Sequence, residues 1–129
     1  MANNFPIGLF DSGIGGISIY NEIKKSIPKE STIYIADNLN APYGEKTKTE
    51  IIRLSIKNTQ KLIDLNCKLI VVACNTATTN AIDVLRKKFN IPVIGIEPSI
   101  KPAMLETKSN NIGVLATEKT LSSNLFLKT

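Results

Sequence analysis

Cys74 is the residue of this sequence best placed to do chemistry. It ends the apolar run "LIVVAC" (69–74), and Asn75 and Thr76 begin a block of small polar residues directly after it. A thiol at the start of a helix has its thiolate stabilised by backbone amides and the helix dipole, which lowers its pKa below the ordinary value of about 8.5. The position predicts a reactive base or nucleophile. Cys67, at the amino end of the same strand, is typical of a buried structural cysteine.

The absence of histidine limits what Cys74 can do. A Ser-His-Asp triad, a Cys-His pair and a His-ligated metal are all excluded within this chain. The two cysteines have C-x6-C spacing, which fits neither a zinc knuckle nor a C-x-x-C redox pair. The sequence has no secretory signal, which argues against a disulfide between them. We therefore expect no metal site.

A second candidate segment, "DSGIGG" (11–16), follows the apolar run "IGLFD". Asp11 and Ser12 come before glycines that allow a tight turn into a helix, whose first amides favour an anion. The segment is neither a Walker loop nor G-x-G-x-x-G. A plain turn capped by Asp11 is an equally good interpretation.

Two more segments add polar groups after apolar runs. In "APYGEK" (41–46), Tyr43 and Gly44 offer a phenol or backbone amides, although a simple turn explains this segment as well. In "ATEKTLSS" (116–123), Thr117 and Thr120 offer hydroxyl groups. Each signal is weak alone, but in an open α/β sheet all of these residues would meet at the carboxyl edge, where ligands bind.

The elements that would position these residues alternate between strands and helices. Short apolar runs predict buried parallel strands at 7–11, 32–37, 69–74 and 92–96, with a fifth candidate at 112–117. A first helix is expected to run through Ile27 and to end at Pro28. A second is expected over 48–65, begun by a capping box at 47–50, and a third after Cys74, ending near Asn90. The second helix is expected to place Ile52, Ile56 and Ile63 on one face. The alternation predicts an α/β fold: an open parallel sheet with helices on both faces, of the flavodoxin-like or Rossmann-like three-layer kind.

Composition narrows the class of protein. The chain has 129 residues, of which 43% are apolar and 21% charged, with a net charge of +5. The lysines are scattered and aromatic residues make up only 5%, so neither a basic stripe nor stacking platforms indicate a nucleic-acid partner. No apolar run is long enough for a membrane span, and the N-terminus lacks a signal-peptide pattern. We expect a cytoplasmic protein with no membrane or nucleic-acid partner.

Taken together, the motifs resemble a known family. "GLFDSGIGG", "APYGEK", "VVACNTATTNAI", "GIEPSIKPA" and "GVLATEKTLSS", in this order, are similar to the glutamate racemases of the cofactor-independent aspartate/glutamate racemase family. The resemblance covers essentially the whole chain. It implies interconversion of L- and D-glutamate for peptidoglycan by two cysteines on opposite faces of the α-carbon, with no cofactor and no metal.

The resemblance also implies roles for individual residues. Cys74 would be one of the acid/base thiols, and Asp11 would lie beside the reacting centre. The substrate's charged groups would be held by Ser12, Tyr43, Gly44, Asn75 and Thr76, and by Thr117 and Thr120 in a further segment. The family's second catalytic cysteine has no counterpart here, because Cys67 does not match its position.

The family fold has two similar α/β domains with the site between them. We interpret residues 1–97 as the first domain, lacking its C-terminal completion, and 98–129 as the beginning of the second, so that the chain is a truncated, weakly active or inactive form. Exposed apolar faces favour self-association, and we expect a homodimer. The alternatives are an aspartate racemase-like enzyme, a thiol acyltransferase lacking its usual basic partner, and a non-catalytic carboxylate-binding remnant.

Overall fold

A four-stranded parallel sheet forms the body of the protein. The computed structural model describes residues 4–128, and its sheet has the order β2-β1-β3-β4. The strands are β1 (Ile7–Asp11), β2 (Thr32–Ala36), β3 (Leu69–Val72) and β4 (Val93–Gly95). β1 pairs with both β2 and β3, so the chain proceeds to one side of β1 and then to the other. This change of direction creates a crevice at the carboxyl ends of β1 and β3.

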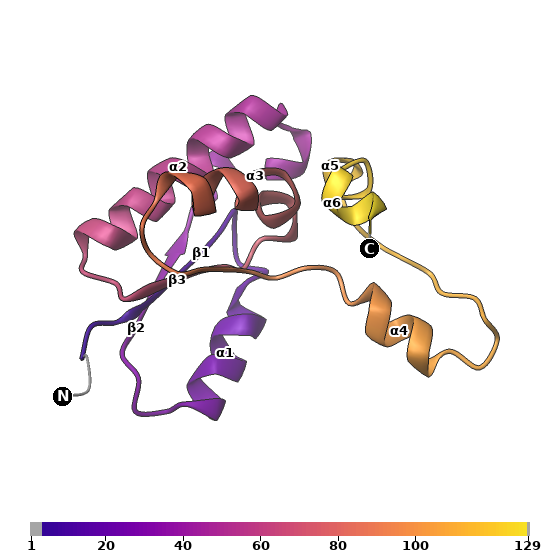
Figure 1. Ribbon diagram of the computed structural model, residues 1–129, viewed down its shortest axis with the longest axis horizontal. Helices are drawn as coiled ribbons and strands as arrows, with labels where there is room; N and C mark the ends of the chain where they lie inside the picture. Colours follow the sequence, from indigo (N-terminus) through magenta and orange to yellow (C-terminus); the bar gives the residue numbers. More distant parts are fainter. Residues whose placement is uncertain (1–3, 129) are drawn as a thin grey trace.

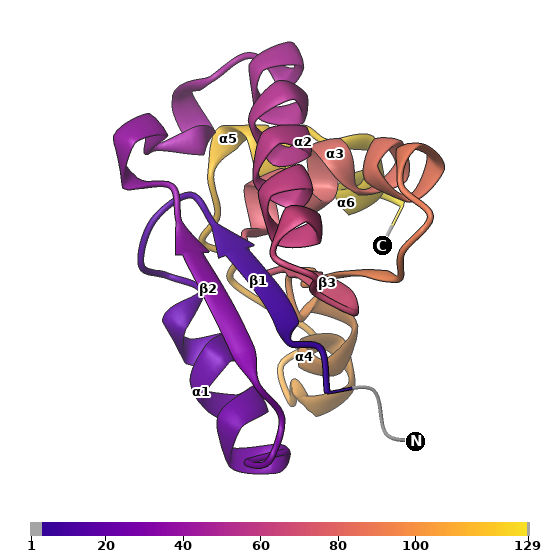
Figure 2. The ribbon, with the colours of Figure 1, turned by 90° about the vertical axis from the view of Figure 1, so that its left-hand side faces the viewer.

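Helices cover both faces of the sheet, as the alternating pattern predicts (Figures 1 and 2). On one face, α1 (Ile17–Ser26) packs Ile19 and Ile23 against Leu9 and Val71. On the other face, α2 (Lys48–Asp64) and α3 (Asn75–Lys88) enclose the larger core around Phe10, Ile70 and Val72. The predicted three-layer α/β architecture is confirmed.

The start of α2 follows the predicted capping box. The Glu50 amide donates to Thr47 Oγ1 (3.3 Å), and Glu50 Oε2 accepts from the Thr47 amide (2.9 Å). Such a cap contributes about 1 kcal/mol to helix stability. The three isoleucines predicted to share one face of α2 are not its most deeply buried residues. Ile51, Leu54 and Leu62 are its fully buried apolar residues, whereas Ile52, Ile56 and Ile63 are only partly buried.

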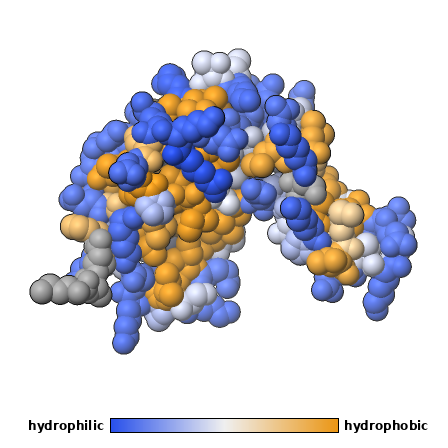
Figure 3. All heavy atoms as spheres, viewed as in Figure 1, coloured by the Kyte–Doolittle hydropathy of each residue, from blue (hydrophilic) through white to orange (hydrophobic). Residues whose placement is uncertain are grey.

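Beyond β4 the chain leaves the body as an arm. Residues 97–117, here called the arm, carry α4 (Ile100–Glu106) and return so that α5 (Glu118–Leu121) and α6 (Asn124–Leu127) lie beside α3 (Figure 1). Figure 3 shows apolar side chains on the arm and a hollow between it and the body. Met104, Leu105 and Leu115 are 61%, 87% and 103% exposed.

The fifth strand expected at 112–117 is not formed. These residues have no regular secondary structure, because no strand of the described chain lies beside them to share backbone hydrogen bonds. The residues after them form two short helices, α5 and α6, each begun by a capping hydroxyl, Thr117 and Ser123 respectively.

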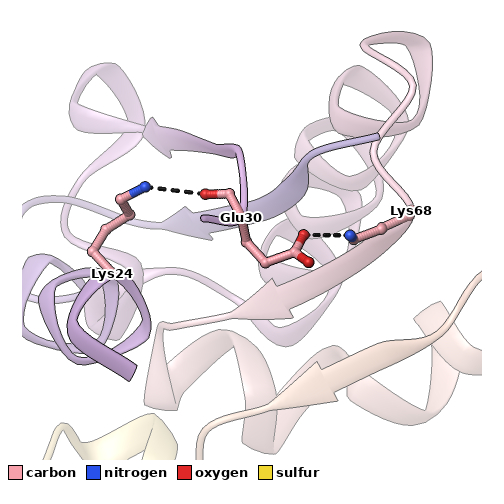
Figure 4. A network of polar contacts seen from close by, with 3 residues as sticks. All are labelled: Lys24, Glu30 and Lys68. Atoms are coloured by element: carbon pink, nitrogen blue, oxygen red, sulfur yellow. Dashed lines mark hydrogen bonds and ion pairs between the residues drawn. The ribbon is translucent and has the colours of Figure 1, made fainter. Parts of the chain in front are cut away.

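Polar contacts fasten the amino ends of the strands, opposite the crevice. Glu30, just before β2, forms an ion pair with Lys68, just before β3, and its carbonyl accepts from Lys24 Nζ (3.0 Å) (Figure 4). No helix within residues 4–128 is both long and apolar enough to cross a membrane.

Candidate functional site

The crevice at the carboxyl edge brings Asp11 and Cys74 to one cavity. Asp11 ends β1, and Cys74 follows β3 as the N-cap of α3. Both line a cavity of about 230 Å³ together with Asn75 and Ile96. Cys74 is only 5% exposed and Asp11 only 6%, so both groups are largely removed from water.

The Cys74 sulfur has two polar neighbours. Cys74 Sγ lies 3.5 Å from Ser12 Oγ and accepts a hydrogen bond from the Ala77 amide in the first turn of α3 (3.4 Å). These contacts favour the thiolate, but burial outweighs them and raises the pKa of Cys74, with the nearby Asp11 charge acting in the same direction. The expectation of a lowered pKa was therefore wrong, because it weighed the helix terminus without the burial.

Asp11 caps the turn between β1 and α1, which is one of the two arrangements predicted for this segment. Its Oδ2 accepts hydrogen bonds from the amides of Gly13 (3.3 Å) and Gly16 (3.0 Å). A Cβ on Gly16 would lie 2.7 Å from that of Ala73, so only glycine lets the turn approach β3 this closely. This capping fixes the Asp11 carboxylate beside Cys74.

A second cluster is built from three hydroxyl groups. Thr76 Oγ1, at the start of α3, lies 2.9 Å from Thr117 Oγ1 and 3.3 Å from Thr120 Oγ1. The Thr117 and Thr120 hydroxyls lie 3.0 Å apart. Asn80 Nδ2 also donates to the Lys119 carbonyl (3.1 Å), which fastens α5 to α3. The predicted residues of two distant segments thus meet in this cluster, here called the threonine cluster.

Gly44 and Tyr43 lie in different environments although they are neighbours in the chain. Gly44 packs against Thr117, where an added Cβ would come within 2.7 Å of Cγ2. The Tyr43 side chain is 1% exposed, and its hydroxyl donates to Asp37 Oδ2 (2.6 Å). A phenol facing the crevice, one of the predicted arrangements, is therefore not found.

Sequence reasoning missed Asp37, Asn58 and Tyr34. Asp37 directly follows β2, so the strand-end rule that selected Asp11 would have selected it too. Asn58 lies within α2 and Tyr34 within β2, where no local pattern signals a role. The Tyr34 hydroxyl donates to the Gly13 carbonyl (3.2 Å), and burial, aided by the Asp11 and Cys74 charges, raises the pKa of Tyr34 to about 12.

Cys67 lies apart from this site. It precedes β3, whereas Cys74 follows it, so the two residues stand at opposite ends of the strand, with backbone positions up to about 23 Å apart at roughly 3.3 Å per extended residue. Cys67 is 6% exposed within the core, and burial raises its pKa as well. Residues 4–128 contain no group of three or more side chains suited to hold a metal ion.

Comparison with known proteins identifies the family of this fold and site. Residues 7–129 match the family described as Asp/Glu/Hydantoin racemase. The chain belongs to this racemase family. Among curated relatives, the glutamate racemase of Ralstonia pickettii (strain 12J) is 49% identical over 123 residues, covering 95% of this chain and 44% of the relative. The glutamate racemase of Clostridium acetobutylicum is 52% identical over 124 residues, covering 95% and 48%.

Solved structures of the racemase family share the fold. Glutamate racemase from Aquifex pyrophilus matches with a TM-score of 0.87 and 38% identity, covering 96% of this chain and 50% of that one. The Escherichia coli glutamate racemase, in complex with L-glutamate and the activator UDP-MurNAc-Ala, matches with a TM-score of 0.88 and 40% identity, covering 96% and 47%. The chain thus spans about half the length of the racemases that it matches.

Proposed function

We propose that this chain supplies one of the two acid/base thiols of a glutamate racemase, together with one wall of its substrate site. The observation that carries the proposal is the position of Cys74: a buried thiol in the crevice, at the N-terminus of α3, beside Asp11. The glutamate racemases among its relatives, and the glutamate complexes of two of them, support glutamate rather than aspartate as the substrate.

Cys74 would act as the base for one face of the substrate. Its thiolate takes the α-proton, the C–H electron pair remains on the α-carbon, and a second thiol on the opposite face returns a proton with inversion. A thiol whose pKa is raised by burial is a stronger base once ionised. The substrate's positive ammonium group, arriving in this dry crevice, favours ionisation by Coulomb attraction. Neither a cofactor nor a metal takes part in this scheme.

The polar groups around the crevice would hold the two ends of the substrate. Ser12 and Asn75 lie next to the thiol, and the threonine cluster offers hydroxyl donors for a carboxylate. Cys67 is too far from Cys74 to be the second thiol, which in this proposal belongs to another polypeptide segment. The role that follows is the supply of D-glutamate for peptidoglycan in the cytoplasm.

Exchange of the α-proton tests this proposal. The chain is incubated in D₂O with L-glutamate or D-glutamate, and the α-proton signal is followed by NMR. A base on one face reaches the α-proton of only one enantiomer, so we expect deuterium in one enantiomer and no inversion. Cys74→Ser should abolish the exchange, and the matched variant Cys67→Ser should retain it.

The remaining outcomes assign other functions. Exchange that survives Cys74→Ser would identify a different base and overturn the proposal. Binding of glutamate without any exchange would indicate a carboxylate-binding remnant. Preferential exchange with aspartate would correct the substrate.

A further inference from the structure

Asp37 joins three segments at the carboxyl edge of the sheet. Its amide donates to the Asp11 carbonyl (2.9 Å), which continues the pairing of β2 with β1. Its Oδ2 accepts from the Tyr43 hydroxyl (2.6 Å) and from Asn58 Nδ2 (3.1 Å), and its Oδ1 accepts from Asn40 Nδ2 (2.8 Å). One carboxylate therefore connects β2, the 38–45 loop and the middle of α2.

The Tyr43 hydroxyl is engaged both as a hydrogen-bond donor and as an acceptor. It donates its one hydrogen to Asp37 and accepts from Asn58 Nδ2 (3.1 Å). Burial, then the hydrogen bond and charge of Asp37, raise the pKa of Tyr43 far above its ordinary value. Burial opposes ionisation of Asp37, but the hydrogen bonds from Tyr43, Asn40 and Asn58 outweigh it and lower the pKa of Asp37. The phenol stays protonated and directed at an ionised carboxylate.

The position of Tyr43 sets that of the next residue, Gly44, which touches the threonine cluster. Tyr43 and Gly44 belong to the same short 3-10 turn, Tyr43–Glu45. Gly44 packs so closely on Thr117 that no side chain fits between them. Thr117 caps α5 by accepting from the Thr120 amide (3.2 Å), and its hydroxyl contacts Thr76. The contacts run without a gap from Asp37 to the hydroxyls proposed to face the substrate.

We propose that Asp37 and Asn58 are positioning residues, which hold the Tyr43–Glu45 turn against Thr117 through the buried Tyr43 hydroxyl and so set the geometry of the threonine cluster. The substrate assigned to that cluster, glutamate, rests on the proposed function. The positioning of the Tyr43–Glu45 turn by Asp37 and Asn58 does not depend on the proposed function. Tyr43 itself takes no proton from the substrate, since its hydroxyl is committed to Asp37 and Asn58.

The variant Asp37→Asn tests the inference, because it keeps the shape of the side chain and removes the charge. Asp64→Asn is the matched control: the same change at the exposed last residue of α2, where the carboxylate accepts from Gln60 Nε2 (2.8 Å). Amide hydrogen exchange should rise in residues 43–46 and 117–121 of Asp37→Asn but stay unchanged in β1 and β3. Asp64→Asn should leave both segments as they are.

Two further readouts separate positioning from general loss of stability. An ultraviolet titration should show the Tyr43 transition at lower pH in Asp37→Asn, identified as Tyr43 by its absence in Tyr43→Phe. The glutamate concentration that protects Cys74 from iodoacetamide should rise by about tenfold, the change expected for weakening one hydrogen bond to a charged group.

The outcomes distinguish this inference from the proposed function. If glutamate does not protect Cys74 in the unaltered chain, the proposed function fails, and hydrogen exchange alone decides the inference. If Asp37→Asn does not fold, Tyr43→Phe takes its place with the same expected rise in exchange. Unchanged exchange of residues 117–121 in the folded variant, or a rise spread over the whole sheet, overturns the inference.

Discussion

The Cγ2 methyl of Thr117 occupies the space that a side chain on Gly44 would need, with only 2.7 Å between it and an added Cβ. Gly44→Ala should therefore push α5 away from α3 and destabilise the protein by about 1–3 kcal/mol, the usual cost of overpacking. Gly113→Ala is the matched control, because nothing lies within 4 Å of its added Cβ. Chemical denaturation measures both changes. Equal stability of the two variants would show that α5 does not pack against the turn as described.

Cys74 should react with iodoacetamide before Cys67. Both thiols are buried, but Cys74 lines a cavity, whereas Cys67 is packed in the core. The thiolate is the reactive form, and burial raises the pKa of Cys74, so the rate should keep rising above pH 8.5, where a free cysteine is half ionised. Peptide mapping after partial alkylation measures the order. Preferential labelling of Cys67 would contradict the assignment.

Asp11→Asn should lower the pKa of Cys74. The Asp11 charge disfavours the thiolate next to it, and removing that charge shifts the alkylation profile of Cys74 to lower pH. The amide side chain retains an oxygen for the Gly13 and Gly16 amides, so the loss of stability should be about 1 kcal/mol. An alkylation profile that stays in place would show that the two groups do not interact.

The protein should lose stability in acid partly through Asp37. Its folded pKa lies below the unfolded value near 3.9, so its contribution is present above that pH and is lost as pH falls through the folded pKa. Thermal unfolding between pH 7 and pH 3 should show a shallower acid decline in Asp37→Asn. An identical decline in both proteins would mean that Asp37 is not stabilised by its neighbours.

The chain should self-associate through the arm. Leu105 and Leu115 are almost fully exposed there, and exposed apolar side chains that gather in one region favour association. We expect a dimer by light scattering and a monomer after Leu105→Ser with Leu115→Ser. The control is Leu39→Ser, which removes an equally exposed leucine (94%) outside the arm. A double variant that remains dimeric would place the contact elsewhere.

Much of the fold is predictable because its signals are local. β1 to β4 are short apolar runs, and the start of α2 follows from Thr47 and Glu50, three residues apart. The 112–117 segment has the same apolar character, yet it forms no strand, because a strand depends on a neighbour that the segment itself does not encode. An apolar run shows that a segment is able to form a strand, but the segment becomes one only where a neighbouring strand shares its backbone hydrogen bonds.

Some features of the candidate site are likewise predictable from local sequence, and others are not. Asp11 and Cys74 are predictable from the rule that ligands meet strand ends, and the pairing of β1 with β3 brings them to one cavity. The sign of the Cys74 pKa shift was not predictable, because it depends on how completely other elements bury the sulfur. Asn58 gives no local signal at all, since its partners lie 15 and 21 residues away in the chain.

The hydroxyls of Thr76, Thr117 and Thr120 close a ring of three oxygen–oxygen contacts. Each hydroxyl has one hydrogen to give, so the ring is satisfied when every hydroxyl points to the next, in either direction of circulation. Under the proposed function, an arriving carboxylate would take a hydrogen out of the ring by rotation of an O–H bond alone. The cluster can therefore reverse its hydrogen bonds without moving a heavy atom: Thr76 and Thr120 are buried and satisfied within the ring, and Thr117, the exposed member, is the one able to donate outward to an anion.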